Sequence, residues 1–312
     1  CYVRVLITGI AGFIGSHLAD RLLVEGHEVY GIDNLLTGRE ENVADDVAFW
    51  EGSIIDDGDD VLSVVFAEAE PEVVYHAAAS YNDPANIERD MLTNAYGTAR
   101  VVSECKRAGT RRLIYFQTSL CYGLYSPPHP MSVRQQLNPR GSYAVSKTAG
   151  EQTIRDSGLD YISFRLANIY GSRNLTGPIP TFYQRLRTSQ PCTVADTRRD
   201  FVYINDAIDL FARAAAEGRP GVYHVSTGGD YSIETLYDTI RDVLHLDRLA
   251  PQHVPRQVDD TSTLLLDPTA TLGEFPGWSA KTALGEGIAR AVAWYDAHGV
   301  GETFTHLKAA NG

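Results

Sequence analysis

Three glycines between a strand pattern and a helix pattern constrain this chain more than any other feature. Gly9, Gly12 and Gly15 have the spacing GxxGxxG in VLITGIAGFIGSHL. An apolar run precedes them and an amphipathic run follows them, as expected for a strand and a helix. Glycine there permits a tight turn, lets backbone N–H groups approach a pyrophosphate and allows close packing of helix on sheet. The segment predicts a dinucleotide-binding turn; a turn that needs glycine for packing alone is the alternative.

The first 170 residues alternate short β-branched runs with longer helical patterns, which is typical of βαβ units and a parallel sheet. We therefore predict an α/β fold: a Rossmann-like doubly wound parallel sheet, followed by a smaller α/β C-terminal substrate lobe. In such sheets ligands bind beyond the carboxyl ends of the strands. The expected strands are at 3–8, 28–33, 47–52, 72–78, 112–117 and 161–166, with helices near 14–25, 58–69, 88–108 and 142–156.

The pattern changes after Gly171, where SRNLTGPIP forms a proline- and glycine-rich loop. We assign residues 1–171 to the NAD-binding Rossmann domain and expect 204–228, a helix and a strand, to return to it. Residues 172–203 and 229–312 form the predicted sugar-nucleotide-binding lobe. Helical patterns in this lobe follow TFYQRLRTS, SIETLYDTIRDVL and KTALGEGIARAVAWYDAHG.

Charge and composition exclude several classes of function. The 27 basic and 40 acidic residues give a net charge of −13, which argues against a nucleic-acid-binding surface. No apolar run approaches the roughly 20 residues that span a bilayer, so we expect neither a membrane segment nor a signal peptide. Four cysteines without metal-ligand spacing (Cys1, Cys105, Cys121, Cys192) predict a reducing, cytoplasmic location and no metal site. Because the sequence starts without methionine just before a strand pattern, we expect a few residues to precede it.

An acidic residue ends the second predicted strand. Asp33 follows Gly15 by 18 residues, where a carboxylate accepts hydrogen bonds from the ribose hydroxyls of adenosine. Its charge repels a 2′-phosphate, and the next arginine, Arg39, is six residues away. We therefore predict NAD rather than NADP as the cofactor. A polar strand end without a ligand is the alternative.

Tyr143 and Lys147, in SYAVSK, share one face of a predicted helix. A free phenol with a pKa of about 10 is a poor base at neutral pH. A lysine ammonium about 4 Å away contributes on the order of 4 kcal/mol at an effective dielectric of about 20, or about three pKa units. The pair predicts a tyrosine base whose pKa is lowered by lysine; a surface Tyr/Lys pair is the alternative.

Hydroxyl groups end the strand RLIYFQTSLCYG, at the edge where the reactive ring of the cofactor belongs. Thr118 or Ser119 is positioned to hydrogen-bond a carbinol oxygen while Tyr143 takes its proton. The thiol of Cys121 is most simply explained as buried packing. For His129 and Arg134, in the following loop, contact with substrate and exposure to solvent are equally consistent with the sequence.

The motifs YHAAAS, NAYGT, TSLCYG, SYAVSKTAGE, RLANIYG and RDFVYINDA extend over nearly the whole chain. With the glycine motif, they make the chain resemble an extended short-chain dehydrogenase/reductase of the NAD-dependent nucleotide-sugar epimerase/dehydratase family. The resemblance implies a catalytic set of Thr118, Tyr143 and Lys147. It implies cofactor contacts from these last two and from Gly9, Gly12, Phe13, Ile14, Gly15, Asp33, Asn34, Ser53, Ile54, Ala77, Ala78, Ala79 and Asn94. It implies substrate contacts from Thr118, Ser119, Asn168, Pro178, Arg199 and Arg256.

Three of these assignments carry an alternative. Asn94 is better explained as a support for the active-site backbone than as a catalytic group. Asn168 is equally consistent with a structural role, and Arg256 with a solvated surface charge.

The chain departs from the family pattern at several positions. Family dehydratases follow the catalytic threonine with Asp-Glu, and decarboxylases commonly carry Ser-Glu, whereas this chain has Ser119 and Leu120. Leucine cannot transfer a proton, so both reactions are disfavoured. Ser53 replaces an adenine-contacting aspartate, and Tyr81 lies near the place of a ribose-binding lysine.

The resemblance and the missing acidic pair favour a C4 epimerase acting on a UDP- or dTDP-sugar through a transient 4-keto sugar. A dehydratase, a UDP-glucuronate decarboxylase, an oxidoreductase and a non-catalytic NAD-binding protein are the alternatives. Family dimers pair through helices matching 88–108 and 142–156, so the resemblance also implies a homodimer.

Overall fold

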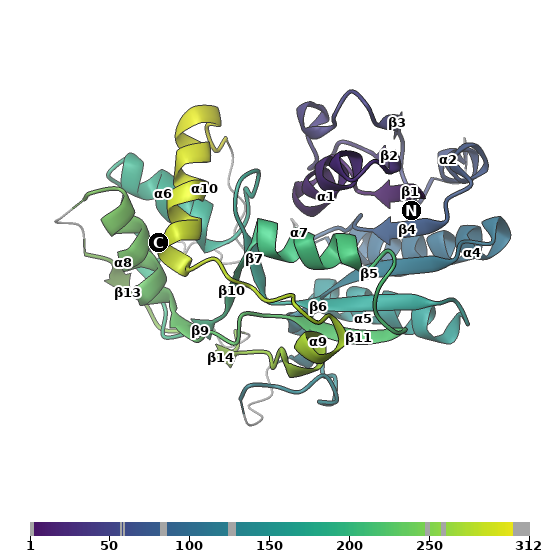
Figure 1. Cartoon of the computed structure of the whole chain (residues 1–312). Helices are drawn as coiled ribbons and strands as arrows, with labels where there is room; N and C mark the ends of the chain where they lie inside the picture. The colour runs from purple at the N-terminus through teal and green to yellow at the C-terminus, as the bar shows by residue number, and fades with distance from the viewer. Residues whose placement is uncertain are drawn as a thin grey trace.

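Seven parallel strands form the central sheet of the computed structural model, which describes residues 3–56, 58, 60–81, 86–123, 129–246, 250–256 and 260–301 (Figure 1). Cys1 lies outside the described residues. In spatial order the strands are β11 (Gly221–Val225), β6 (Tyr161–Leu166), β5 (Arg112–Thr118), β4 (Val73–His76), β1 (Arg4–Thr8), β2 (Glu28–Asp33) and β3 (Ala48–Glu51). Every neighbouring pair is parallel, which confirms the predicted fold class.

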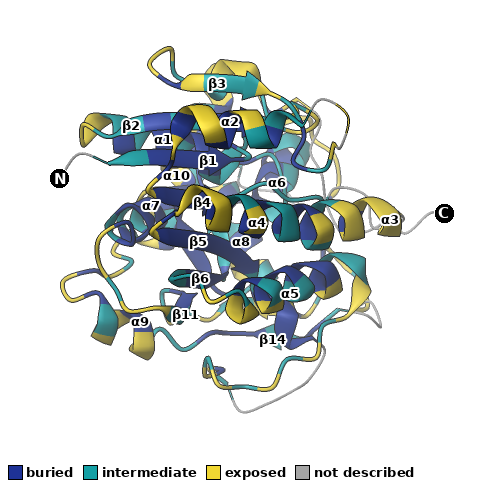
Figure 2. Ribbon diagram, turned by 90° about the vertical axis from the view of Figure 1, so that its right-hand side faces the viewer, coloured by how far each residue is buried: buried dark blue, intermediate teal, exposed yellow. Residues whose placement is uncertain are grey.

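Apolar side chains alternate between the two faces of the sheet and build two separate cores. Val5 and Ile7 of β1 point into one core, and Leu6 points into the other. Both faces of a parallel sheet need a helical cover, and the central strands are accordingly buried in Figure 2. The helices are α1 (Phe13–Val24) and α7 (Ile204–Arg213), which contact each other on one face, and α2 (Val61–Ala69), α4 (Thr98–Ala108) and α5 (Gly141–Asp156) on the other.

The helix expected at 88–108 is divided into three parts. It comprises α3 (Ile87–Asp90), a π-helical segment η2 (Met91–Gly97) and α4. Single π turns inside helices often occur at functional sites. Here the π turn contains Asn94, whose side chain bonds to groups beside the site described below.

The C-terminal elements form a smaller unit at the carboxyl edge of the sheet (Figure 1). Its helices α6 (Pro178–Arg187), α8 (Ile233–Val243) and α10 (Leu284–His298) contact one another. Its short strands are β7 (Asn168–Tyr170), β8 (Thr193–Val194), β9 (Arg198–Arg199), β10 (Phe201–Tyr203), β12 (Tyr231–Ser232), β13 (Gln252–His253) and β14 (Thr263–Leu264), which pair in three small sheets.

One late segment packs on the large sheet instead. Helix α9 (Thr269–Glu274) contacts β11, and Trp278 donates from Nε1 to the carbonyl of Asp206 in α7. Two 3₁₀ turns, η1 (Glu40–Asn42) and η3 (Ser119–Tyr122), complete the described elements. No helix in the described part of the chain combines the length and apolarity that a membrane span requires.

Candidate active site

At Gly9 and Gly15, the segment joining β1 to α1 has no room for a side chain larger than hydrogen. Gly9 has φ of +74°, and a Cβ placed on it would lie 2.6 Å from the amide nitrogen of Ala78. A Cβ on Gly15 would lie 2.2 Å from the carbonyl oxygen of Gly9. Gly12 begins helix α1 as its N-cap. The turn is therefore a backbone cradle at a helix N-terminus, which fits the pyrophosphate of NAD.

Asp33 lies beside this cradle at the end of β2. Its Oδ2 accepts from the N–H of Ala11 at 3.0 Å, and its Oδ1 accepts from the N–H of Leu35 at 2.9 Å. Burial raises the pKa of Asp33, and these N–H groups partly offset that effect. Each oxygen of a carboxylate accepts more than one hydrogen bond, so the group retains capacity for ribose hydroxyls.

A cavity of about 1080 Å³ extends from this turn, along the carboxyl ends of the strands, to the C-terminal elements. It is lined by Tyr143, Lys147 and all but two of the other predicted site residues: Gly9, Gly12, Phe13, Ile14, Gly15, Asp33, Asn34, Ser53, Ile54, Ala77, Ala78, Ala79, Thr118, Ser119, Asn168, Pro178 and Arg199. A site assembled from such distant segments is expected where parallel strands end at a common edge.

Asn94 is one of the two exceptions. Its side chain is buried behind the wall, where Oδ1 accepts from the N–H of Ser80 and Nδ2 donates to the Ser80 carbonyl and to Ser146 Oγ. Asn94 is therefore not placed among the groups lining the cavity, in contrast to its assignment as a cofactor contact. Its bonds support the backbone after β4, as the structural alternative predicted.

The hydroxyl residues lie where β5 ends and the η3 turn begins. Thr118 is the N-cap of η3, and its Oγ1 accepts from the N–H of Leu120 at 3.1 Å. That bond uses a lone pair and leaves the hydroxyl proton free for donation. Tyr143 and Lys147 face the same cavity from successive turns of α5.

The electrostatics of the Tyr/Lys pair differ from the sequence-based expectation. Lys147 is buried with Nζ 4.0 Å from the centroid of the Tyr115 ring, and burial lowers its pKa to about 7. The pKa of Tyr143 is raised, not lowered, chiefly by burial and further by Tyr81 and Asp90. In the protein without cofactor, desolvation thus outweighs the lowering of the Tyr143 pKa that the Tyr/Lys spacing predicted, because it weakens the lysine charge and disfavours the phenolate.

The three residues whose roles the sequence left open lie outside the cavity lining. Cys121 is fully buried, and burial raises its pKa to about 12, which agrees with a packing role. His129 and the exposed Arg134 also do not line the cavity. The structure gives none of the three a place beside Tyr143.

Polar groups at the other end of the cavity hold Arg199. Its Nη2 lies 2.7 Å from Asp260 Oδ1, and burial lowers the pKa of the guanidinium. Asn168 donates from Nδ2 to the carbonyl of Asp200 at 3.0 Å. Arg256, the second exception, is exposed and donates to the carbonyl of Asp260, so it lies beside the lining rather than in it.

Sequence spacing missed several lining residues. Arg39 and Asn42 reach the cradle because the loop after β2 folds back on Ala11: Arg39 N and Asn42 Nδ2 donate to its carbonyl at 3.1 and 3.0 Å. Tyr81 lies opposite the proposed base, with its ring centroid 6.0 Å from that of Tyr143. Arg185 of α6 also lines the cavity. Of these four residues, only Tyr81 could have been identified as a site residue from the sequence, because it follows the motif YHAAAS directly.

Known proteins resemble this chain over nearly its whole length. Residues 5–226 match the model of the NAD dependent epimerase/dehydratase family. A UDP-glucose 4-epimerase of Mycolicibacterium smegmatis is 33% identical over 94% of this chain and 98% of its own. The crystal structure of the Bordetella bronchiseptica enzyme WbmG in complex with NAD and UDP superposes with a TM-score of 0.90 at 40% identity, covering 99% of this chain and 98% of that one. UDP-glucuronic acid decarboxylase 1 of Arabidopsis thaliana is 27% identical over 93% of this chain and 69% of its own.

The glycine cradle yields a direct prediction. Gly15→Ala should lower NAD affinity at least about tenfold and destabilise the fold by about 1–3 kcal/mol, because the new methyl group collides with the Gly9 carbonyl. NAD released from purified protein and thermal unfolding measure the two effects. Gly273→Ala is the control, since a Cβ on Gly273 meets no heavy atom within 4 Å. Normal NAD content in Gly15→Ala would show that the cradle does not hold the cofactor.

Proposed function

The chain belongs to the NAD-dependent epimerase/dehydratase family, and we propose that it is a nucleotide-sugar C4 epimerase working through a transient 4-keto sugar. The observation that carries the proposal is the composition of the cavity wall near Tyr143. Thr118, Tyr143 and Lys147 line it, and Leu120 occupies the position where water-eliminating relatives carry an acid.

The described residues hold NAD at one end of the cavity. The cradle at Gly9, Gly12 and Gly15 binds the pyrophosphate, and Asp33 binds the adenosine ribose. When bound there, NAD⁺ would supply a reversible hydride acceptor and a positive charge that favours the Tyr143 phenolate. The charge matters because the surrounding protein by itself raises the pKa of Tyr143.

The side chains perform the proton transfer. Thr118 donates a hydrogen bond to the C4 oxygen and orients it, while Tyr143 takes the C4 hydroxyl proton. Lys147, with a pKa of about 7, favours the phenolate when it is charged. The 4-keto sugar then rotates to present its other face. Return of the hydride to C4 on that face and of the proton from Tyr143 to the C4 oxygen inverts the centre without net redox change.

The placement of carboxylates argues against dehydration and decarboxylation. Removal of water from adjacent carbons requires an acid and a base beside the sugar. Among the described cavity-lining residues the carboxylates are Asp33, at the glycine cradle, and Asp260, paired with Arg199. Neither lies beside Tyr143, so oxidation and reduction of one carbinol is the chemistry that this wall supports best.

We propose a UDP-sugar as substrate, with its diphosphate near Arg199, Asn168 and Arg256. The UDP bound to WbmG supports the choice of nucleotide, and a dTDP-sugar is the alternative. The described parts of residues 172–203 and 229–312 form the substrate lobe in this proposal, except the α9 segment, which packs on the large sheet. A cytoplasmic location stays a prediction.

Tyr143→Phe tests the chemistry. Purified wild-type protein should convert a UDP-hexose or UDP-uronic acid into its C4 epimer without added cofactor, and loss of the base should lower kcat by about 10²–10⁴-fold. Product formation is followed by NMR on a panel of UDP- and dTDP-sugars. Tyr223→Phe, which removes a hydroxyl bonded to the Arg219 carbonyl outside the cavity, should retain activity. A dehydrated or decarboxylated product, or an unaffected Tyr143→Phe, would overturn the proposal.

We also propose that the protein is a homodimer. Apolar side chains on α3, η2 and α5 are exposed, among them Ile87 (61%), Met91 (40%), Leu92 (41%) and Val145 (41%). These elements contact one another and form one face, and exposed apolar faces of this kind often mark protein interfaces.

Light scattering tests the dimer. Wild-type protein should have twice the chain mass of 34.3 kDa, and a Met91→Glu, Leu92→Glu double variant should have the single-chain mass. Leu272→Glu, at an exposed leucine of α9, is the control and should stay dimeric. A single-chain mass for the wild-type protein at micromolar concentration would contradict the proposal.

A further inference from the structure

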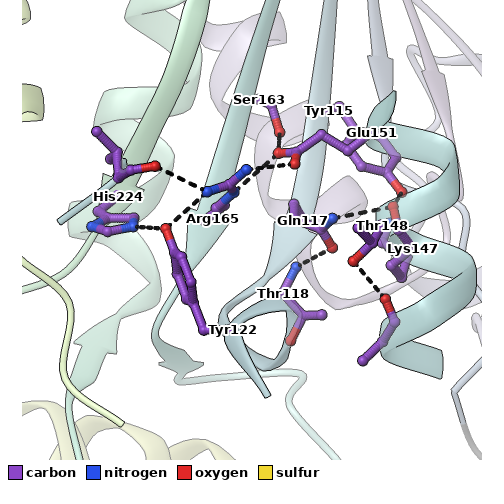
Figure 3. A network of polar contacts seen from close by, with 12 residues as sticks. Tyr115, Gln117, Thr118, Tyr122, Lys147, Thr148, Glu151, Ser163, Arg165 and His224 are labelled. Atoms are coloured by element: carbon purple, nitrogen blue, oxygen red, sulfur yellow. Dashed lines mark hydrogen bonds and ion pairs between the residues drawn. The ribbon is translucent and has the colours of Figure 1, made fainter. Parts of the chain in front are cut away.

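Helix α5 presents a third polar residue one turn beyond the proposed catalytic pair. Tyr143, Lys147 and Glu151 succeed one another at intervals of four residues, so they share a face of the helix. Glu151 does not line the cavity; its carboxylate faces strand β6. There it accepts from Ser163 Oγ at 2.6 Å and from Arg165 Nη2 at 2.7 Å (Figure 3).

Arg165 lies between helix α5 and the η3 turn (Figure 3). We call η3 the hydroxyl turn, because Thr118 and Ser119 stand at its start. Its Nε and Nη2 bond to Glu151, while its Nη1 donates to Tyr122 Oη at 2.9 Å and to the Val133 carbonyl at 3.2 Å. The Arg165 and Glu151 side chains are only 3% and 1% exposed. The guanidinium therefore holds groups from α5 and from η3 in one fixed geometry.

The hydrogen bonds that link Glu151, Arg165 and Tyr122 continue from Tyr122 to His224 on β11. Nδ1 of His224 lies 3.0 Å from the carbonyl of Asp267, which only accepts, so Nδ1 carries the proton. Burial lowers the pKa of His224 to about 4, and the neutral ring must then accept at Nε2. Tyr122 Oη lies 2.5 Å from that atom and donates to it, which leaves its oxygen to accept from Arg165.

The hydroxyl turn is thus tied to α5 at both ends. At its start, Gln117 accepts from the N–H of Thr118 at 2.8 Å and donates to the Lys147 carbonyl at 3.1 Å. At its end, Tyr122 reaches Glu151 through Arg165. The η3 turn lies between these two anchors, with Thr118 and Ser119 at its start.

Stability alone does not account for a buried ion pair at this place. Removing two charges from water is costly, and well-packed apolar residues often stabilise a core at least as well. Hydrogen bonds, unlike apolar contacts, fix direction and distance. Displacements of about 1 Å at a reacting group are enough to reduce rates on the order of 10²-fold.

We propose that Arg165 and Tyr122 are positioning residues that hold the hydroxyl turn at its working distance from Tyr143. They touch neither substrate nor cofactor; they act through the turn. The proposal rests on the epimerase function proposed above.

Tyr122→Phe and Arg165→Lys test this role. Each should lower kcat by about 10- to 100-fold, with the KM for the sugar nucleotide and the NAD content changed less than about twofold. The double variant should lose little more kcat than the worse single variant, because both changes break one chain. Tyr75→Phe is the matched control: it also removes one buried phenol bond, to the Phe211 carbonyl, but that bond joins β4 to α7 rather than to the η3 turn, so kcat should be retained.

Hydrogen exchange of the resting protein provides a readout that needs no substrate. Amides in a peptide covering residues 117–123 should exchange faster in both variants and at the wild-type rate in Tyr75→Phe. An unchanged kcat, a loss confined to KM, an equal kcat loss in Tyr75→Phe, or unchanged exchange would overturn the proposal. Failure of both variants to fold while Tyr75→Phe folds would also overturn it. If the wild-type protein epimerises no sugar nucleotide, the proposed function fails, yet exchange still decides whether these residues hold the turn.

Discussion

All strands of the central sheet point the same way, and the site depends on this constraint. Because the strands are parallel, their carboxyl ends lie on one edge, and the chain leaves the sheet there at the glycine turn, at Asp33 and at Thr118. Residues more than a hundred positions apart therefore line one cavity. Because Gly15 has no Cβ, helix α1 packs directly against the turn that closes one end of that cavity. The C-terminal elements close the other end around Arg199.

Burial, rather than pairing of opposite charges, is the main cause of the pKa shifts of Tyr143 and Lys147. Desolvation lowers the pKa of Lys147 and raises that of Tyr143, so the protein alone favours the neutral form of both. The Arg165–Glu151 ion pair lies deeper and carries no net charge, and both side chains make further hydrogen bonds, to Tyr122 and Ser163. In the proposed mechanism, this arrangement makes the reactivity of Tyr143 depend on the cofactor's charge.

Local patterns predicted the features that local geometry determines. The strands and helices of the sheet domain, the glycine turn, Asp33 and the Tyr143/Lys147 pair follow from periodicity and spacing of a few residues. The choice of Thr118 over Ser119 came from the family resemblance instead. Features that depend on long-range contacts were not predictable in this way. Arg39 reaches the cavity only because its loop folds back on Ala11. Arg165 meets Tyr122 only because β6 pairs with β5, the strand that leads into the η3 turn. The sign of the pKa shift of Tyr143 was wrong because spacing says nothing of burial. A motif also does not show that the Asn94 side chain bonds to Ser80 behind the cavity wall, and its contact with the cofactor stays a prediction.

The central claim is that one carbinol carbon loses a hydride and regains the same hydride on its opposite face. The most direct test is to follow deuterium placed on C4 of an accepted sugar nucleotide while the NAD-loaded protein acts on it in ordinary water. We expect the inverted product to retain deuterium at C4, because the hydride never exchanges with solvent. A product carrying solvent hydrogen at C4, or one that has lost water or carbon dioxide, would contradict this account.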